Sequence, residues 1–295
     1  MTRKVLSLVL AMVMAGSFTA FAGETTKETT AATPTIDAST IPGLEDGVLT
    51  VAMECAYAPY NWAQPDDSNG AVPIKDSILY ANGYDVMTAK NICEYLGVEL
   101  EIVQLDWDSL IPAVQAGVVD AVIAGQSMTA ERMESVNFAG PYLYASIVCL
   151  TKADSTYASA NGISDLTGGK CTSQSGTIWY DTCLPQIEGA NIQSPAESAP
   201  AMIMAVESGT VDFVCTDMPT AQAAVSAYPD LVIVDFSDSD DNFVVSDEDI
   251  NIGISVAKEN TALKDAIDSY LSTLTADDFN ELMASAIEIQ PLSEE

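Results

Sequence analysis

The stretch Ala113-Val114-Gln115-Ala116-Gly117-Val118-Val119-Asp120-Ala121-Val122 recurs 92 positions later as Ala205-Val206-Glu207-Ser208-Gly209-Thr210-Val211-Asp212-Phe213-Val214. The copies share the pattern A-V-x-x-G-x-V-D-x-V, in which the end of an amphipathic helix is followed by a glycine and then by an apolar strand. Helix–strand units of this kind build parallel-rich sheets covered by helices. The repeat therefore predicts an α/β fold made of two similar units, although two ordinary helix–strand units can also share so short a pattern by chance.

The rest of the sequence supplies further elements for such a fold. Strand-like runs cover residues 48–53, 100–103, 118–124, 147–151, 170–172, 211–216 and 231–234, and helical patterns cover 84–96, 109–116, 178–184, 201–207 and 263–274. The chain is longer than a usual single domain, which indicates two lobes. Open α/β sheets bind ligands beyond the carboxyl ends of their strands, and two-lobed proteins usually bind them in the cleft between the lobes.

The first 22 residues have the features of a secretory signal peptide. They begin with Arg3 and Lys4, continue through an apolar stretch and end in Ala20-Phe21-Ala22, a typical cleavage signal. We therefore expect an extracytoplasmic protein, in the periplasm or at the cell exterior, and no N-terminal lipid anchor, because no cysteine lies at the cleavage point. Residues 23–43 are rich in Thr and Ala and are expected to form a flexible tether.

The composition excludes several classes of function. The chain has 43 acidic and 10 basic side chains, a net charge of −33, and no histidine. Such acidity disfavours nucleic acids and anionic membranes as partners. Because the chain has no histidine and its six cysteines lack CxxC spacing, we expect no zinc, haem or other cofactor. The absence of histidine also excludes His-dependent catalysis. The cysteines are interpreted mainly as small buried hydrophobic residues, and whether any of them pair is left open.

Arg132 is the only arginine after Arg3, and its position is unusual. It follows the strand-like run 118–124 by a few small and hydroxyl residues and falls in the first turn of a predicted helix. Backbone N–H groups at such a point, together with one guanidinium, can receive a carboxylate. The alternative is an exposed arginine paired with Glu131 or Glu134.

The repeat offset relates this region to an acidic residue in the second unit. Adding 92 positions to Gly125 gives Asp217, at the end of the equivalent strand. One unit thus ends in a receptor for an anion and the other in a carboxylate, which suits a cation. Two such groups facing each other across a cleft match an α-amino acid held by both of its charges.

Short motifs from about Val48 to Leu282 carry a family resemblance. In order they are Glu54-Cys55-Ala56-Tyr57-Ala58-Pro59-Tyr60, Gly83-Tyr84-Asp85-Val86, Asp106-Trp107-Asp108-Ser109-Leu110-Ile111-Pro112, Ser127-Met128-Thr129-Ala130-Glu131-Arg132, Ser175-Gly176-Thr177 and Asp217. This series resembles the family 3 extracellular solute-binding proteins, which serve polar amino acid ABC importers. The resemblance implies a bilobal periplasmic-binding-protein-like fold of type II, with two parallel-rich sheets flanked by helices and joined by a two-strand hinge. Lobe 1 would comprise residues 44–145 and 251–295, and lobe 2 residues 146–250.

The resemblance also implies roles for individual residues. Arg132, Ser127 and the Thr177 backbone N–H would hold the ligand α-carboxylate, with Gly176 beside Thr177. Asp217, the Gly125 carbonyl and the Ser127 hydroxyl would hold the α-ammonium. Tyr57 and Trp107 would enclose the ligand side chain, and Glu54 lies where some members read a cationic side chain. For Tyr57 and Trp107, a turn residue and a core anchor are the alternative interpretations, and Gly176 with Thr177 can simply cap a helix.

The function expected from these residues is capture of an amino acid, with a cationic side chain slightly favoured, and delivery to an ABC importer. The partners would be the free amino acid and the membrane permease, and the protein would be a monomer and not an enzyme. Two alternatives stay open. One is an enzyme on the same fold, such as a dehydratase of cyclic amino acid precursors, which would use Glu54 and Asp217 as acid and base. The other is a ligand-sensing module.

Overall fold

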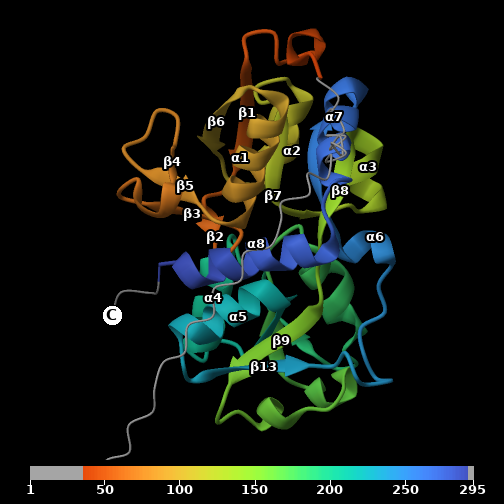
Figure 1. Cartoon of the computed structure of the whole chain (residues 1–295). Helices are drawn as coiled ribbons and strands as arrows, with labels where there is room; N and C mark the ends of the chain where they lie inside the picture. The colour runs from red at the N-terminus through yellow and green to blue at the C-terminus, as the bar shows by residue number, and fades with distance from the viewer. Residues whose placement is uncertain (1–35, 292–295) are drawn as a thin grey trace, which may run out of the picture. The chain divides into compact units, whose positions relative to one another are not determined.

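The computed structural model describes residues 36–291, so the predicted signal peptide and most of the predicted tether lie outside the described residues. Two five-stranded sheets organise the described part of the chain, one in the upper and one in the lower half of Figure 1. We call each sheet with its surrounding elements a lobe. Each sheet contains two parallel and two antiparallel strand pairings, so both are mixed.

The sheet of lobe 1 has the strand order β6-β1-β7-β14-β8. Its strands are β1 (Val48–Met53), β6 (Glu99–Gln104), β7 (Ala121–Ser127), β8 (Val136–Tyr144) and β14 (Asn251–Ala257). The helices that pack on this lobe are α1 (Tyr84–Leu96), α2 (Trp107–Gln115), α3 (Ala130–Ser135) and α7 (Thr261–Leu271). Thus the last strand and helix α7, which come late in the sequence, complete a sheet that begins with β1.

The sheet of lobe 2 has the strand order β11-β10-β12-β9-β13. Its strands are β9 (Ile147–Lys152), β10 (Lys170–Thr172), β11 (Asn191–Ile192), β12 (Phe213–Asp217) and β13 (Leu231–Asp235). Helices α4 (Ala199–Glu207) and α5 (Met218–Ala227) pack against β9 and β12. The parallel pairs β1–β7 and β10–β12 therefore occupy comparable places in the two sheets.

The repeated pattern forms the same local structure in both lobes. Helix α2 is followed by Gly117 and strand β7, and helix α4 by Gly209 and strand β12. Both glycines have left-handed backbone angles, with φ of 67° and 71°, at the turn that ends each helix. The interpretation of the repeat as two equivalent helix–strand units is confirmed.

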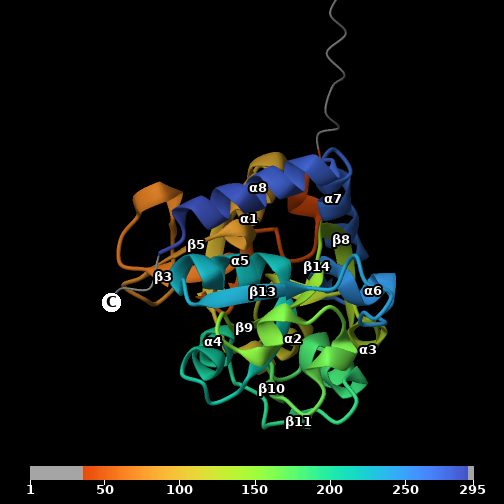
Figure 2. The same cartoon turned by 90° about the horizontal axis from the view of Figure 1, so that it is seen from below.

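The chain passes between the lobes at two neighbouring places. Strand β8 continues into β9 through Ala145 and Ser146, and helix α6 (Asp247–Ile250) leads back from lobe 2 into β14. The N–H of Ala145 donates to the carbonyl of Ile250 over 2.9 Å, so the two passages are bonded to each other. Helix α8 (Ala276–Ile289) also touches both lobes, because it packs against α1 and α5 (Figures 1 and 2).

A small sheet next to the first one was not expected from the sequence. It has the order β2-β3-β5-β4, formed by β2 (Ala56–Tyr57), β3 (Asn61–Gln64), β4 (Val72–Pro73) and β5 (Tyr80–Asn82). Its strands have two to four residues, too short for an alternating pattern to stand out. The sheet matters because β2 carries Tyr57.

Most predicted boundaries differ from the structure by one to three residues, and two elements show why. Strand β7 begins three residues later than predicted, because Val118 is exposed in the turn after Gly117, and it continues to Ser127, which pairs with Ile252 of β14. The helix predicted over 178–184 is a π-helical turn, Trp179–Cys183, followed by a 3₁₀ turn, Leu184–Gln186. Pro185 lies in the second turn and has no N–H to donate, which is why a regular helix does not continue there.

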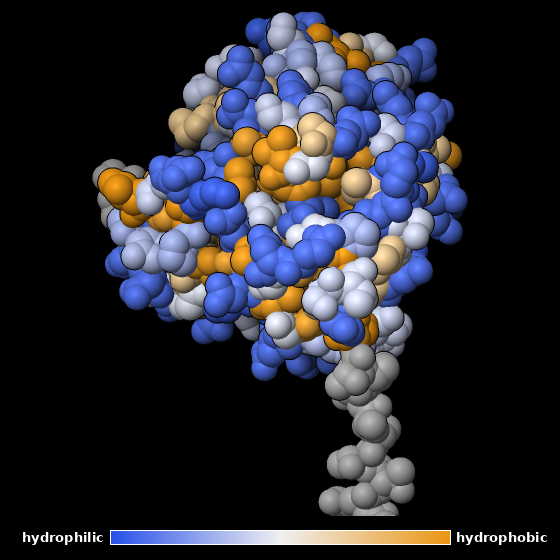
Figure 3. All heavy atoms as spheres, turned by 90° about the horizontal axis from the view of Figure 1, so that it is seen from above, coloured by the Kyte–Doolittle hydropathy of each residue, from blue (hydrophilic) through white to orange (hydrophobic). Residues whose placement is uncertain are grey.

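The face drawn in Figure 3 is largely hydrophilic, with apolar side chains gathered between the hydrophilic ones. All six cysteines are buried and none is disulfide-bonded. Cys215 lies opposite Cys149 in the β12–β9 ladder. Within residues 36–291, no helix is long and apolar enough to cross a membrane.

Candidate functional site

Strand β7 of lobe 1 and the segment that follows β10 of lobe 2 meet at a small space between the two lobes, and Asp217 at the end of β12 adjoins it by bonding to Tyr57. The space has a volume of about 10 Å³. Its lining residues are Tyr57, Trp107, Gly125, Ser127 and Arg132 from lobe 1, and Gln174, Thr177 and Trp179 from lobe 2. The carboxyl ends of strands from both lobes therefore meet at one place, as expected for open α/β sheets.

Arg132 lies in the first turn of α3, where the Thr129 side chain caps the helix by accepting a bond from the Arg132 N–H over 3.2 Å. The guanidinium donates to two backbone carbonyls, those of Ser127 over 2.8 Å and Gly176 over 2.9 Å. It also lies over the Trp107 ring, 5.3 Å from the ring centre. Burial lowers the pKa of Arg132 to about 10, so the group stays charged at neutral pH.

Two of the backbone N–H groups near Gly125 and Arg132, which the sequence analysis offered as partners for a carboxylate, are already paired. The Gly125 N–H donates to the Tyr142 hydroxyl over 3.1 Å, and the Met128 N–H donates to the Asn251 carbonyl over 2.9 Å. The physical reason is that the Tyr142 side chain of β8 reaches Gly125, and that Met128, directly after β7, bonds to Asn251 at the start of the neighbouring strand β14. The guanidinium remains the candidate group for an anion at this point.

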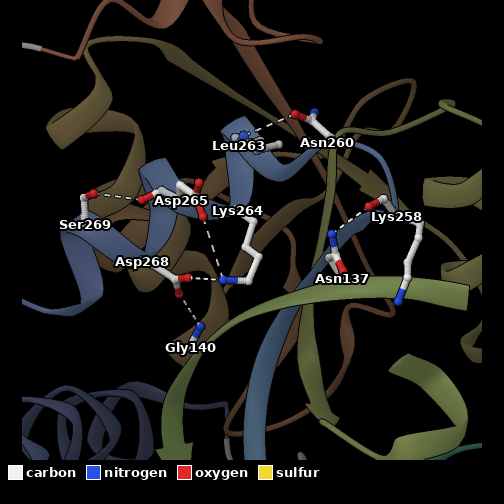
Figure 4. A network of polar contacts seen from close by, with 9 residues as sticks. All are labelled: Asn137, Gly140, Lys258, Asn260, Leu263, Lys264, Asp265, Asp268 and Ser269. Carbon is white, nitrogen blue, oxygen red and sulfur yellow. Dashed lines mark hydrogen bonds and ion pairs between the residues drawn. The ribbon is translucent and has the colours of Figure 1, made fainter. Parts of the chain in front are cut away.

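Lys258, one of the few basic residues, holds the end of the helix that carries Arg132. Its ammonium donates to the carbonyl oxygens of Met133 and Val136 at the C-terminal end of α3. The Lys258 carbonyl in turn accepts a bond from the Asn137 amide over 2.6 Å (Figure 4). A cation at the last carbonyls of a helix is favourable both as a hydrogen-bond donor and for the helix dipole.

Asp217 ends β12 and caps helix α5. Its carboxylate accepts bonds from the N–H and the hydroxyl of Thr220, over 2.9 and 3.0 Å. Two tyrosines of lobe 1 reach the same carboxylate, Tyr57 over 2.5 Å and Tyr60 over 3.3 Å. Burial raises the pKa of Asp217, and the bonds from Tyr57 and Thr220 oppose that shift.

The two tyrosines stack with ring centres 4.7 Å apart, directly against Gly125. Gly125 has a left-handed φ of 63°, and a Cβ atom there would lie 2.8 Å from Cε1 of Tyr57. Only glycine fits both the backbone angle and the contact. Behind this layer, the Tyr142 hydroxyl that binds the Gly125 N–H donates to buried Asp85 over 2.6 Å.

Glu54 is 7% exposed and contacts lobe 2 through Gln174. The Gln174 amide nitrogen lies 3.4 and 3.3 Å from the two carboxylate oxygens. Burial raises the pKa of Glu54 to about 7, Gln174 opposes the shift, and Asp106 and Asp108 add to it. A cavity of about 700 Å³ adjoins Glu54, and its charged lining residues, Glu54, Asp106, Asp108 and Glu197, are all acidic.

Residues 49–286 match the family model of the bacterial extracellular solute-binding proteins, family 3. The chain belongs to this family. A probable histidine-binding protein of Campylobacter jejuni is 30% identical over 185 residues, which make up 62% of this chain and 65% of that relative. The chain thus aligns with just under two thirds of the length of this curated relative.

Two solved structures with the same fold support the assignment to the solute-binding family. An amino acid ABC transporter substrate-binding protein from Streptococcus pneumoniae, bound to L-arginine, has a TM-score of 0.69 and 27% identity, covering 83% of this chain and 96% of that one. An ancestral amino acid-binding protein, a precursor of cyclohexadienyl dehydratase, has a TM-score of 0.67 and 27% identity. The match covers 83% of this chain and 97% of that one. The bilobal α/β fold expected from the sequence is confirmed.

The structure of this solute-binding protein brings all nine candidate residues to one region. Tyr57, Trp107, Gly125, Ser127, Arg132 and Thr177 line the small space. The other three are one contact away, because Gly176 binds Arg132, Asp217 binds Tyr57, and Glu54 binds Gln174. Their individual roles remain predictions.

The sequence analysis missed three residues of the site, Tyr60, Gln174 and Trp179. Tyr60 closes the motif that begins at Glu54, and Gln174 directly precedes Ser175-Gly176-Thr177, so adjacency to a motif was the available signal. Nothing in the sequence distinguishes Trp179 from a core residue. Among the described residues, no group of three or more acidic or cysteine side chains is arranged to hold a metal ion.

Proposed function

We propose that this protein binds a free amino acid between its two lobes for delivery to an ABC importer. The observation that carries the proposal is the placement of two opposite charges. Arg132 of lobe 1 lines the space between the lobes, and Asp217 of lobe 2 binds Tyr57, which lines the same space. An amino acid that separates the lobes slightly can place its carboxylate on Arg132 and its ammonium on Asp217.

Further groups support this orientation of the ligand. Ser127 and Thr177 lie beside Arg132, and the Gly125 carbonyl and the Ser127 hydroxyl can accept from the ammonium near Asp217. Tyr57 and Trp107 provide aromatic faces against which an aliphatic stem or a cation can pack. Gly176 follows Gln174 and Ser175 in the loop that faces Arg132. The ligand would thus contact both lobes and bridge them.

We further propose that the preferred ligands carry a cationic side chain. Glu54 and the acidic cavity beside it offer carboxylates and no competing cation among their charged lining residues. An ionised Glu54 paired with a guanidinium or ammonium would regain the interactions that burial denies it. The names of the relatives point the same way, since they include a histidine-binding protein and an arginine complex.

Isothermal titration with L-arginine, L-lysine, L-histidine and L-leucine tests the proposal. We expect the three cationic amino acids to bind more tightly than leucine. Arg132→Ala and Asp217→Asn should each weaken binding by about thirtyfold to several thousandfold, the range for removing one partner of a buried charge pair. Lys75→Ala is the control, because it removes one exposed cation that pairs with Glu101 on the surface of lobe 1. Unchanged binding by Arg132→Ala or Asp217→Asn contradicts the site assignment.

A dehydratase-like enzyme is the second candidate, because the pKa of Glu54, about 7, suits a group that donates a proton near neutral pH. We nevertheless propose a binding protein without turnover. Incubation with each bound amino acid, followed by mass spectrometry, decides between the two. Recovery of unchanged ligand supports the binding protein, and accumulation of a dehydrated or deaminated product contradicts it.

The domain boundaries and partners form the last part of the proposal. We place lobe 1 at residues 44–145 and 251–295 and lobe 2 at 146–250, supported by the sheet to which each strand belongs. The protein would act as a monomer that docks on a membrane permease after residues 1–22 are removed on export. N-terminal sequencing of the exported protein should find Gly23, and light scattering should give the mass of one chain.

A further inference from the structure

Three of the hydrogen-bonding contacts that join the two lobes across the site concern us here, and a fourth, longer bond from Tyr60 also reaches Asp217. The Tyr57 hydroxyl of lobe 1 donates to Asp217 of lobe 2 over 2.5 Å. The Arg132 guanidinium of lobe 1 donates to the Gly176 carbonyl of lobe 2 over 2.9 Å. The third contact runs the other way, from the Gln174 amide of lobe 2 to Glu54 of lobe 1.

Each contact satisfies a group to which we assign a part of the ligand. A phenol O–H takes the place of an ammonium donor on Asp217, and a carbonyl oxygen takes the place of a carboxylate on Arg132. An amide NH₂ takes the place of a cationic side chain on Glu54. The protein therefore supplies its own substitutes for all three interactions.

The space between these groups is too small for an amino acid. Its volume of about 10 Å³ admits roughly one water molecule. A ligand can enter only if the three contacts separate, so its binding free energy is reduced by the free energy of those contacts.

Tyr57 makes the shortest of the three contacts. Tyr57 and Asp217 are 6% and 1% exposed, and a short hydrogen bond to a buried carboxylate is stronger than a neutral one. Burial and the nearby Asp217 charge raise the pKa of the Tyr57 phenol, which keeps it a donor over the physiological pH range. Tyr60 reaches the same carboxylate only at 3.3 Å.

We propose that the Tyr57 hydroxyl is an internal competitor of the ligand, which holds the lobes together through Asp217 until an α-ammonium displaces it. This proposal rests on the proposed function, because it takes Asp217 as the ammonium site. It assigns Tyr57 a second role beside that of an aromatic wall. The competition also sharpens selectivity, since a molecule with only one of the two charges of an amino acid cannot replace the contacts at both Asp217 and Arg132.

Tyr57→Phe tests the proposal because it keeps the aromatic ring and removes only the hydroxyl. Ligand carried over from expression is first removed by unfolding and refolding, and the probes are L-arginine, L-lysine and L-histidine. We expect Tyr57→Phe to bind the best of these about tenfold more tightly than the parent, as for release from one hydrogen bond to a charged group. Tyr60→Phe should give a smaller gain and carries the test if Tyr57→Phe does not refold.

Tyr228→Phe is the matched control, because its hydroxyl donates to Met204, which also belongs to lobe 2. It should bind like the parent. Equal or weaker binding by Tyr57→Phe overturns the competitor role while leaving the proposed function intact.

If the parent protein binds none of the three amino acids, the proposed function fails and a second measurement decides on the contact between the lobes. Small-angle scattering without added amino acid should then show a larger radius of gyration for Tyr57→Phe than for the parent and for Tyr228→Phe. An unchanged radius of gyration would overturn the proposal that Tyr57 holds the lobes together.

Discussion

Asp120 and Asp212, the aspartates of the two repeat copies, make the same pair of hydrogen bonds in the two lobes. The N–H of Asp120 donates to the Thr50 carbonyl over 2.9 Å, and the Asp120 carboxylate accepts from the Thr50 N–H over 2.8 Å. Asp212 bonds to the carbonyl and the N–H of Lys170 in the same way, both over 2.8 Å. Each aspartate thereby fixes the neighbouring parallel strand, β1 or β10, against the strand that leads to the site.

Replacing either aspartate by alanine should lower the free energy of unfolding, because one strand N–H loses its acceptor. We expect about 1 to 2 kcal/mol for Asp120→Ala and about 1 kcal/mol or less for Asp212→Ala, because Asp120 is half-buried and Asp212 is exposed, so water can replace the lost bond there. Urea unfolding of both variants measures the difference. Asp120→Asn keeps an acceptor oxygen and serves as the control; a loss in Asp120→Asn as large as in Asp120→Ala would contradict the explanation.

Glu54 should make stability depend on pH with a defined sign. Burial raises its pKa from 4.5 to about 7, so the folded protein keeps a proton on Glu54 at pH values where the unfolded chain has released it. The contribution of Glu54 to the free energy of unfolding is therefore largest below pH 4.5. It is lost as the pH rises from 4.5 through 7. Between these two limits, the titration of Glu54 changes the free energy of unfolding by at most about 3 kcal/mol.

Glu54→Gln removes this titration and provides the comparison. Asp85, whose pKa burial raises to about 6, acts with the same sign but is present in both proteins. The free energy of unfolding of the parent should therefore fall more steeply than that of Glu54→Gln between pH 5 and pH 8. Parallel pH profiles would show that Glu54 has an ordinary pKa in the folded protein.

Gly125→Ala should both destabilise the protein and disturb the site. The new Cβ would lie 2.8 Å from the Tyr57 ring at a residue with a left-handed φ. Gly117→Ala is a matched control, because Gly117 also has a left-handed φ but no atom lies within 4 Å of an added Cβ. We expect Gly117→Ala to lower the free energy of unfolding by about 1 kcal/mol, and Gly125→Ala to lower it by more.

The difference between the two alanine variants isolates the contact with Tyr57. Urea unfolding gives the stabilities, and titration with L-arginine gives the affinities. Binding should change in Gly125→Ala and remain as in the parent in Gly117→Ala. Equal stabilities of the two variants would mean that Tyr57 moves aside at no cost.

Lys258→Ala should weaken binding although Lys258 is not in the site. Loss of its ammonium leaves the carbonyls of Met133 and Val136 without a donor and loosens helix α3, which carries Arg132. We expect affinity for L-arginine to fall by about three- to tenfold, corresponding to roughly 1 kcal/mol. Hydrogen exchange should speed up at residues 129–135.

Lys264→Ala is the control for this substitution. Lys264 is also a basic residue near β8, but it pairs with Asp268 of α7, which accepts from the Gly140 N–H of β8 (Figure 4). Lys264→Ala removes the same charge as Lys258→Ala, so a nonspecific electrostatic effect would lower affinity in both variants. Equal losses would therefore contradict a positioning role for Lys258.

The sequence predicted those features that depend on local pattern. The bounds of β1, β10 and α1 agree with the structure, because their flanking glycines and periodic apolar residues are local signals. The repeat also indicated that Gly125 and Asp217 occupy equivalent places, and each is the fifth residue of its strand, β7 or β12. By contrast, the extension of β7 to Ser127 depends on pairing with β14, more than 120 residues away along the chain.

By itself, the sequence determined the two-unit α/β fold and the nine residues that surround the site, since helix–strand periodicity and short motifs are properties of neighbouring residues. Only the tertiary structure decided how these residues use their hydrogen bonds. Which donor reaches Asp217, Glu54 or the Gly176 carbonyl depends on contacts between segments more than 40 residues apart, whose distances no local pattern specifies. That is why the paired carbonyls on Arg132 and the Tyr57–Asp217 bond were not foreseen.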